Sequence, residues 1–309
     1  MSKYSGSNPL SKNLKIYMPE PLFSIIIPTY NRAGLIRKTI DSFLNQTFRN
    51  FEVIIVDDGS TDNTEKVIIA IPDSRVRYFK KDNNERAAAR NFGTQKATGK
   101  YVAFFDSDDI AYPNHLEVAA QLIDKSLSEI FALNYEIRDE NNKLINDSQD
   151  FRNINRQLIK GNLLSCSPVF VKREIAVQFP FDEDKSLTGS EDYLLWLQLA
   201  ARYPICFSNM RTSAIIQHSG RSVVSFSKEA LIKRKNLMLR KALNDPSISS
   251  YYKGDLNYLK ENTYSYISLH LVMGKHKKES WYYFQKALGF NWKFFFSRRS
   301  KAIIKRLVF

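Results

Sequence analysis

The chain has 309 residues, 43% hydrophobic and 25% charged, which suits one globular catalytic domain of about 200–250 residues plus an extension. Its net charge of +14 indicates an anionic partner, whether nucleic acid, nucleotide phosphates or an acidic membrane surface. Two cysteines, Cys166 and Cys206, are too few for a disulfide scaffold and lack zinc-site spacing, so a reducing cytoplasmic setting is expected. Residues 1–20 lack the apolar run of a signal peptide, and no stretch reaches the ~18 apolar residues of a membrane span.

Short apolar runs alternate with amphipathic stretches in the first part of the chain. In chain order we expect a strand at 23–27, a helix at 35–44, a strand at 51–56, a helix at 61–71, a strand at 76–79, a helix at 86–97, a strand at 101–105 and a helix at 113–124. This order predicts an α/β fold with a largely parallel sheet, whose ligands bind at the carboxyl ends of the strands.

The rest of the chain is less regular. Strands are expected at 130–137, 168–171 and 214–217, and a helix at 191–201 capped by Ser190. Helices follow at 228–244 and 255–273, and residues 275–309 are rich in Lys, Arg and aromatic residues. We therefore expect a flexible segment (1–20), a catalytic domain (21–225, with a nucleotide half at 21–125 and an acceptor half at 126–225) and a basic, aromatic-rich helical extension (226–309).

Acidic residues follow two of the expected strands and open a later helix. Asp106-Ser107-Asp108-Asp109 follows the strand at 101–105, where carboxylates one residue apart can bind Mg²⁺ or Mn²⁺ together with substrate phosphates. A solvated turn that caps the next helix explains this short motif equally well. Asp57-Asp58-Gly59-Ser60 suits a base or ribose contact, although Asp-Gly is also a common turn. Glu191-Asp192 either complements a helix dipole or supplies a general base, and for these last two motifs alone the simpler alternatives are favoured.

Taken together, these clusters resemble family 2 of the inverting glycosyltransferases, which have the GT-A fold. The resemblance rests on residues 23–32 (FSIIIPTYNR), 40–47, 52–60 (EVIIVDDGS), 88–91 and 99–109 (GKYVAFFDSDD). It is close over residues 23–124 and looser to about residue 225. It implies a Rossmann-like mixed sheet of the nucleotide-diphospho-sugar transferase type.

The resemblance implies roles for individual residues. Those on the donor side are Pro28, Tyr30 and Asp58 around the nucleotide base, Arg32 and Arg90 at the diphosphate, Asp106 at the ribose, and Asp106 and Asp108 at Mn²⁺ or Mg²⁺, with Asp109 in support. Asp192 is expected to be the general base, with Glu191 beside it. His218 is either a further metal ligand or a structural histidine, and the sequence leaves both open. Gln198 stands where members of the family often carry Arg, which leaves acceptor contacts there undefined.

The implied reaction moves a sugar from a nucleotide diphosphate donor, UDP in particular, to an acceptor hydroxyl with inversion. Surface polysaccharide or lipid-linked glycan assembly in bacteria is the expected setting, at the cytoplasmic face of the inner membrane. The processive Gln-x-x-Arg-Trp signature is absent from the sequence, so a single addition is expected. The alternatives are a nucleotidyltransferase, which usually has a Gly-rich loop where this chain has residues 29–32, and a non-catalytic scaffold that binds nucleotide sugars.

The basic, aromatic-rich segment at 275–309 suits the surface of an anionic membrane, which predicts peripheral membrane contact. Single-stranded nucleic acid could use the same side chains, but the sequence carries no recognition motif, so no nucleic-acid partner is expected. The alternative is a helical pair that packs on the domain and exposes a solvated basic face.

Overall fold

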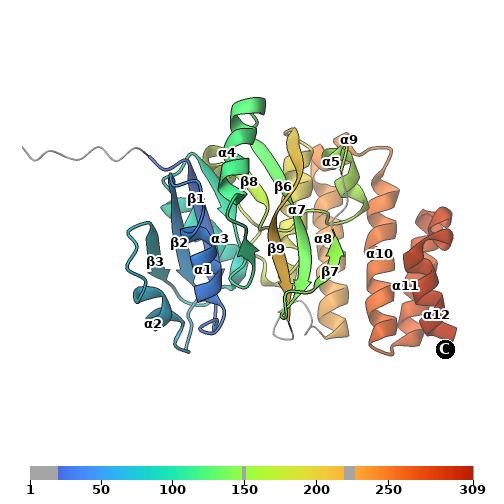
Figure 1. The fold of residues 1–309 in the computed structure, drawn as a ribbon. Coiled ribbons are helices and arrows are strands. Elements are labelled where there is room, and N and C mark those ends of the chain that lie inside the picture. Colours follow the sequence, from blue (N-terminus) through green and yellow to red (C-terminus); the bar gives the residue numbers. More distant parts are fainter. Residues whose placement is uncertain (1–19, 148–150, 219–226, 309) are drawn as a thin grey trace, which may run out of the picture.

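The computed structural model describes residues 20–147, 151–218 and 227–308. The segment expected to be flexible, 1–20, therefore lies outside the described residues except for Glu20. The described chain forms a mixed sheet with helices on both faces and a group of helices at one side (Figure 1).

The sheet has nine strands in the order β3-β2-β1-β4-β8-β6-β9-β5, and β7 pairs with β6. The strands are β1 (Phe23–Thr29), β2 (Phe51–Asp57), β3 (Val76–Lys80), β4 (Tyr101–Phe104), β5 (Ile110–Ala111), β6 (Ile130–Asp139), β7 (Leu144–Asp147), β8 (Val169–Lys172) and β9 (Ile205–Gln217). The helices are α1 (Ile36–Leu44), α2 (Thr64–Ile69), α3 (Glu85–Lys96), α4 (His115–Ser126), α5 (Ile154–Gln157), α6 (Arg173–Gln178), α7 (Glu191–Ala200), α8 (Lys228–Asn244), α9 (Pro246–Tyr251), α10 (Leu256–Met273), α11 (Lys277–Phe290) and α12 (Arg298–Val308).

The first four strands of this order are parallel, as expected from the alternating pattern. β1 pairs in parallel with β2 and β4, so that Thr29 lies beside Asp57 and Ile26 beside Phe104. β8 is antiparallel to both β4 and β6, which makes the complete sheet mixed. Because β1, β2 and β4 run in the same direction, the loops after Thr29, Asp57 and Phe104 emerge at one edge.

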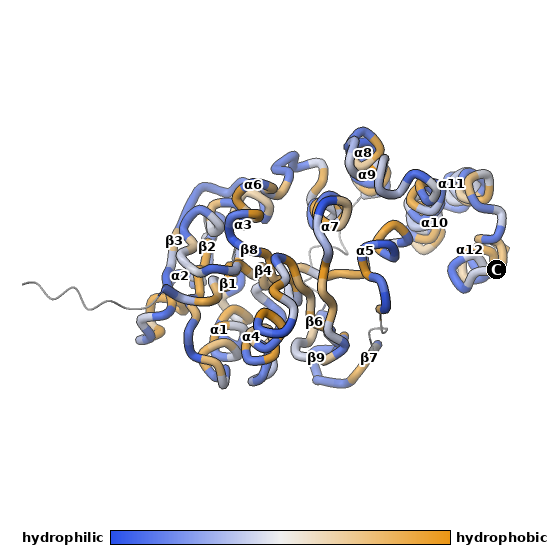
Figure 2. The backbone as a smooth tube through the Cα atoms, turned by 90° about the horizontal axis from the view of Figure 1, so that it is seen from above, coloured by the Kyte–Doolittle hydropathy of each residue, from blue (hydrophilic) through white to orange (hydrophobic). Residues whose placement is uncertain are grey.

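The apolar strands are buried on both faces, which explains why they read as continuous hydrophobic runs. Ile26 faces a core cluster shared with α3 and α7, whereas Ile25 and Ile27 face a second cluster shared with α1 and α4. Figure 2 shows these hydrophobic stretches along the central strands.

The helices after residue 226 pack in two groups. α8 and α10 add Leu237, Met238 and Leu259 to the core cluster beneath α7. α11 and α12 pack beside α10 around Phe284 and Ile303 (Figure 1). None of the helices that the structure describes is long and apolar enough to cross a membrane. The proposed boundary near residue 225 thus falls between elements that share one core.

Several expected boundaries differ from the structure. The helix expected at 61–71 is reduced to α2, because Asp62 accepts hydrogen bonds from the backbone of Ala33 and Thr64 and holds residues 61–63 as a loop. The strand expected at 214–217 is the end of the much longer β9. β5 and β7 are too short to give a period-2 signal.

Gly93 provides a test of how closely α3 packs on the sheet. A Cβ at Gly93 would lie 2.4 Å from Ile26 Cγ2 and 3.2 Å from Val56 Cγ2, and both side chains are fully buried. Gly93→Ala should therefore lower the free energy of unfolding by about 1–3 kcal/mol in urea titrations. Gly289→Ala on α11 is the matched control, since nothing lies within 4 Å of its added Cβ. Equal stability of the two variants would contradict the close packing.

Candidate active site

Two loops at the carboxyl edge of the sheet are bonded to each other. Asn31, with a φ of 50°, accepts a hydrogen bond at Oδ1 from the Thr61 backbone (2.8 Å), and its own N–H donates to Ser60 Oγ (2.9 Å). Tyr30 is 48% exposed beside this contact, and Pro28 is the last residue but one of β1. The predicted base-binding residues Pro28 and Tyr30 therefore lie at the end of β1 and in the loop that follows it, at the edge of the sheet where the acidic motifs lie.

Asp58 is buried in the second of these loops. Its carboxylate forms an ion pair with Lys81 and accepts a hydrogen bond from the backbone of Asn84 (3.0 Å). The preceding Asp57 accepts from the backbone of Ser60 (2.7 Å) and from the Tyr78 hydroxyl (2.8 Å). Asp57 thus closes the turn, while Asp58 carries a cationic partner that the sequence pattern did not reveal.

Asp106, Asp108 and Asp109 form a group of potential metal ligands after β4. One ligand atom from each lies within 4.8 Å of those of the others. Asp109 is fully buried, and both of its carboxylate oxygens accept hydrogen bonds, from Ser167 Oγ (2.7 Å) and from the Ile216 backbone (3.2 Å). Asp109 therefore anchors the loop to β9, and Asp106 and Asp108 are the better placed ligands.

His218 lies beside Asp108 although 110 residues separate them in sequence. Its Nε2 is 2.9 Å from Asp108 Oδ2, and Arg32 Nη2 is 3.8 Å from the same oxygen. His218, predicted as a possible metal ligand, and Arg32, predicted to contact the diphosphate, therefore both lie beside Asp108. The oxygen and imidazole ligands offered here are a donor set that Mn²⁺ or Mg²⁺ can use.

Arg90 connects the loop after β4 to α7. Its side chain is 2% exposed; Nη2 contacts Asp106 Oδ1 at 2.9 Å and Nη1 contacts Glu191 Oε1 at 2.8 Å. The guanidinium also lies over the Phe181 ring, 5.1 Å from its centroid. The sequence resemblance implies a diphosphate contact for Arg90. In the structure its two Nη atoms instead form ion pairs with the carboxylates of Asp106 and Glu191.

Glu191 and Asp192 begin α7 with opposite electrostatic environments. Burial favours the neutral form of Glu191, but the charges of Arg90 and Arg86 outweigh it and hold the pKa of Glu191 below its usual value. Burial and then the charge of Glu191 raise the pKa of Asp192. Asn162 donates a hydrogen bond to Asp192 Oδ2 (2.9 Å), which fixes the direction of that carboxylate.

Ser190 precedes α7 at the expected N-cap position, but its side chain makes no capping hydrogen bond. Its hydroxyl donates to the Gly189 carbonyl (2.9 Å) and accepts from Lys235 Nζ (3.0 Å). Asn162 and Lys235 are the residues near Asp192 that sequence reasoning missed. Asn162 lies in an irregular segment without a signal, whereas Lys235 lies four residues after Leu231 and three before Met238, on the buried face of α8.

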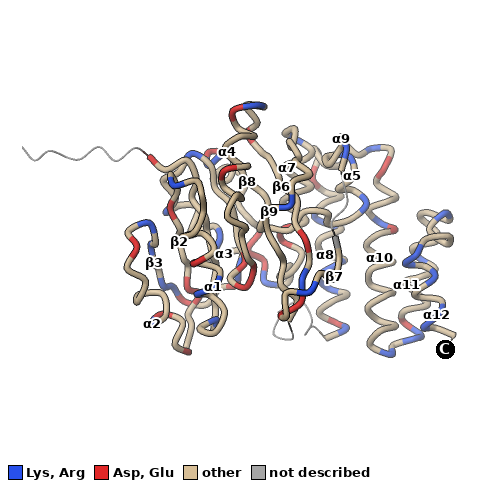
Figure 3. The backbone as a smooth tube through the Cα atoms, viewed as in Figure 1, with Lys and Arg blue, Asp and Glu red and all other residues tan. Residues whose placement is uncertain are grey.

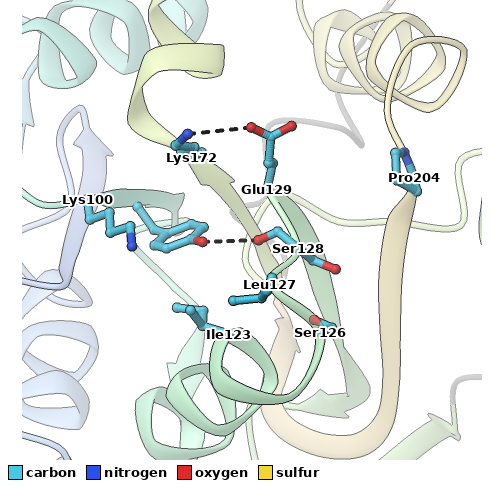
Figure 4. Close-up of a pocket in the computed structure, with 9 residues that line it drawn as sticks. Lys100, Ile123, Ser126, Leu127, Ser128, Glu129, Lys172 and Pro204 are labelled. Atoms are coloured by element: carbon cyan, nitrogen blue, oxygen red, sulfur yellow. Dashed lines mark hydrogen bonds and ion pairs between the residues drawn. The ribbon is translucent and has the colours of Figure 1, made fainter.

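A surface pocket of about 440 Å³ lies elsewhere, between the start of β4 and the start of β9. In Figure 4 the Lys172–Glu129 ion pair crosses its rim, and the Tyr101 hydroxyl donates to the Ser128 carbonyl (3.0 Å). Because Tyr101 is the first residue of β4 and Asp106 follows its end, this pocket lies at the opposite edge of the sheet from the acidic group.

Comparison with known proteins identifies the family. The glycosyl transferase family 2 profile matches residues 24–175. The glucosyltransferase WfgD of Escherichia coli, named for transfer from UDP-Glc to GlcNAc-diphosphoundecaprenol, is 32% identical over 244 residues, or 78% of this chain and 94% of WfgD. The chain belongs to glycosyltransferase family 2. An uncharacterised glycosyltransferase of Rickettsia felis is 30% identical over 244 residues, and there this family 2 chain matches only 39% of the relative's length.

Solved structures confirm the GT-A fold of this family 2 chain. S. aureus TarS 1–349 in complex with UDP-GlcNAc superimposes with a TM-score of 0.67 at 23% identity, covering 92% of this chain and 82% of the TarS 1–349 chain. The mannosyltransferase PcManGT of Pyrobaculum calidifontis, in complex with GDP-Man and Mn²⁺, gives 0.61 at 19% identity, covering 93% and 79%. The predicted Rossmann-like mixed sheet with C-terminal helices is thereby confirmed.

The opposite pKa shifts of Glu191 and Asp192 predict opposite effects on stability at neutral pH. Ionised Glu191 stabilises the fold above its usual pKa, and this contribution is lost as pH falls through its lowered folded pKa. Ionised Asp192 costs stability above its raised pKa. Glu191→Gln should therefore lower the free energy of unfolding by about 3 kcal/mol, because it leaves a buried arginine with one partner fewer. Asp192→Asn should leave it unchanged or raise it by up to about 1 kcal/mol.

Urea unfolding at neutral pH compares these two substitutions, which are adjacent in sequence and similar in shape. A loss of stability in Asp192→Asn as large as that in Glu191→Gln would contradict the assignment of the two environments.

Proposed function

We propose that this protein is an inverting, metal-dependent glycosyltransferase that moves a sugar from a nucleotide diphosphate donor, UDP-linked in particular, to an acceptor hydroxyl. The observation that carries the proposal is the bridge from Asp106 through Arg90 to Glu191, which brings the acidic motif and the carboxylate pair into one site. The nucleotide sugars named for WfgD and TarS support the choice of a UDP donor.

On the donor side, Asp106 and Asp108 would hold Mn²⁺ or Mg²⁺ with His218 as a further ligand. The bound ion would offset the negative charge of the leaving nucleoside diphosphate as a Lewis acid. Arg32, which lies 3.8 Å from Asp108, would contact the same phosphates. Arg90 would position Asp106 and Glu191, and any diphosphate contact it makes would be additional to those ion pairs.

The nucleotide base would lie against the end of β1, at Pro28, and the loop that carries Tyr30. The exposed Tyr30 ring offers a stacking face, and Asp58 offers a hydrogen-bond acceptor beside it. Lys81, the ion-pair partner of Asp58, would hold this carboxylate in place to accept an N–H from the base.

On the acceptor side, Asp192 would take the proton of the attacking hydroxyl. Its raised pKa makes it a stronger base than an ordinary aspartate, and Asn162 holds it in one orientation. Attack from the side opposite the leaving group inverts the anomeric carbon. Gln198 lies within 3.5 Å of Asp245 and takes no part in this arrangement.

The decisive experiment is a panel of nucleotide sugars assayed for nucleotide release with Mn²⁺, Mg²⁺ or EDTA. UDP-sugars should be turned over with either ion, and EDTA should abolish release. Asp192→Asn should lower turnover by about 10²–10⁴-fold while UDP binding, measured by calorimetry, is unchanged. Near-normal turnover by this variant, or an NMR product assignment showing retention at the anomeric carbon, would contradict the mechanism.

The C-terminal helices suggest where the protein acts. Trp281, Tyr282, Trp292, Phe295 and Phe296 are each about half exposed or more, and Figure 3 shows Lys and Arg recurring along α11 and α12. Aromatic rings and cations together suit an anionic bilayer surface. At the cytoplasmic face of the inner membrane, the bilayer would bring a lipid-linked acceptor to the site; WfgD is named for an acceptor of this kind, GlcNAc-diphosphoundecaprenol.

Substituting the exposed aromatics tests this membrane contact without exposing the core of α11 and α12. Trp292 and Phe296 are 65% and 67% exposed, and their ring centroids lie 6.2 Å apart. The Trp292→Ser/Phe296→Ser variant should lose about 10-fold or more in binding to phosphatidylglycerol vesicles, measured by flotation. Ile69→Ser is the control, because Ile69 is 65% exposed on α2 at the far side of the molecule (Figure 1). Unchanged flotation of the double variant would remove this surface from membrane binding.

A further inference from the structure

Four basic side chains, here called the basic cluster, gather next to the Glu191–Asp192 pair. They are Arg234 and Lys235 on α8, His270 on α10 and Arg299 on α12. Lys235 Nζ lies 3.0 Å from Ser190 Oγ, and Arg234 Nη1 donates to the Thr188 carbonyl (3.1 Å). Lys235 of the basic cluster thus contacts Ser190, the residue that precedes the Glu191–Asp192 pair.

The members of the basic cluster come together through the packing of three helices. The Lys235 ammonium lies 4.3 Å from the centroid of the Tyr266 ring, and the same ring is 4.2 Å from that of His270. Arg299 donates hydrogen bonds to Asn262 Oδ1 (2.7 Å) and Ser265 Oγ (2.8 Å). α8, α10 and α12 therefore direct cationic groups toward one region.

The hydrogen-bond partners of Lys235 and Arg299 in these contacts are neutral groups. Burial, followed by the like charge of Arg234, lowers the pKa of Lys235 to about 8. Burial and then the charges of Lys235, Arg234 and Arg299 lower the pKa of His270. Glu261 faces Arg299, and burial raises the pKa of Glu261; the charges of Asp192 and Glu191 act on Lys235 and oppose part of the lowering of its pKa. Desolvated like charges cost free energy in the free protein, and a bound anion would offset that cost.

We infer that the basic cluster binds a phosphate or diphosphate group carried by the acceptor. The inference rests on the proposed function, because the acceptor hydroxyl must reach Asp192, and the cluster begins one residue from the Glu191–Asp192 pair. The donor phosphates are assigned to Arg32 and to the ion that Asp106 and Asp108 would hold, and Asp106 lies across Arg90 from Glu191. Arginine forks and lysine ammonium groups are the side chains that suit phosphate oxygens. The cluster therefore selects acceptors that carry a phosphate near the sugar to be extended.

Calorimetric titration with inorganic pyrophosphate tests the cluster when UDP and Mg²⁺ already saturate the donor site. The wild-type chain should bind pyrophosphate under these conditions. Lys235→Gln should weaken this binding by about 10–100-fold, because it removes one charged hydrogen-bond donor. Lys233→Gln is the matched control, since Lys233 is exposed on the same helix and carries the same charge; its pyrophosphate affinity should not change.

Thermal unfolding separates a lost binding site from a lost fold. Lys235→Gln removes a desolvated charge, so its melting temperature without ligand should equal or exceed that of wild type. Absence of a pyrophosphate site in the UDP-saturated wild type, or equal affinity in Lys235→Gln, would overturn the inference. Failure of UDP itself to bind would instead count against the proposed function.

Farnesyl diphosphate distinguishes the two sources of such a phosphate. Binding much tighter than that of inorganic pyrophosphate, and equally sensitive to Lys235→Gln, indicates a lipid diphosphate. Equal affinities of the two compounds indicate a soluble phosphorylated sugar. Both results retain the phosphate subsite, whereas binding of farnesyl diphosphate that Lys235→Gln leaves unchanged would contradict it.

Discussion

The buried guanidinium of Arg90 is the interaction on which the site depends. It joins the loop after β4 to the first turn of α7, two segments that are far apart in the chain, by ion pairs at 2.9 and 2.8 Å. A buried cation with two carboxylate partners has one low-energy position, since losing either partner leaves a charge unpaired. The spacing between the loop after β4 and the first turn of α7 is thereby fixed.

Glu191 and Asp192 show how neighbouring carboxylates acquire different chemistry from different partners. Glu191 points to Arg90 and Arg86 and is held ionised as a structural charge. Burial and the negative charge of Glu191 raise the proton affinity of Asp192, whereas the hydrogen bond from Asn162 fixes its orientation and opposes part of that rise. The same charge that completes the Arg90 network therefore raises the proton affinity of the adjacent Asp192, so a substitution at Glu191 is expected to change both carboxylates.

The parallel half of the sheet and the gathering of Pro28, Asp58 and Asp106 at its edge were predictable, because strand periodicity and strand direction decide them. The pairing of His218 with Asp108 was left open, since it depends on β9 running the full length of β6. The partners of Arg90 and Asp109 were not predictable from a single sequence, because contacts between distant segments leave no local pattern. Lys235 did leave a signal, a cation at an apolar position of α8.

The hydrogen bond that Asp109 accepts limits how the chain leading to His218 can vary. By accepting a hydrogen bond from the backbone of Ile216, Asp109 sets the alignment between the loop after β4 and the end of β9, two residues before His218. Side chains alternate between faces along a strand, so a slip of one residue in β9 would turn the imidazole away from Asp108. An insertion between Ile216 and His218 would likewise move the imidazole away from Asp108, because Asp109 holds the backbone at Ile216.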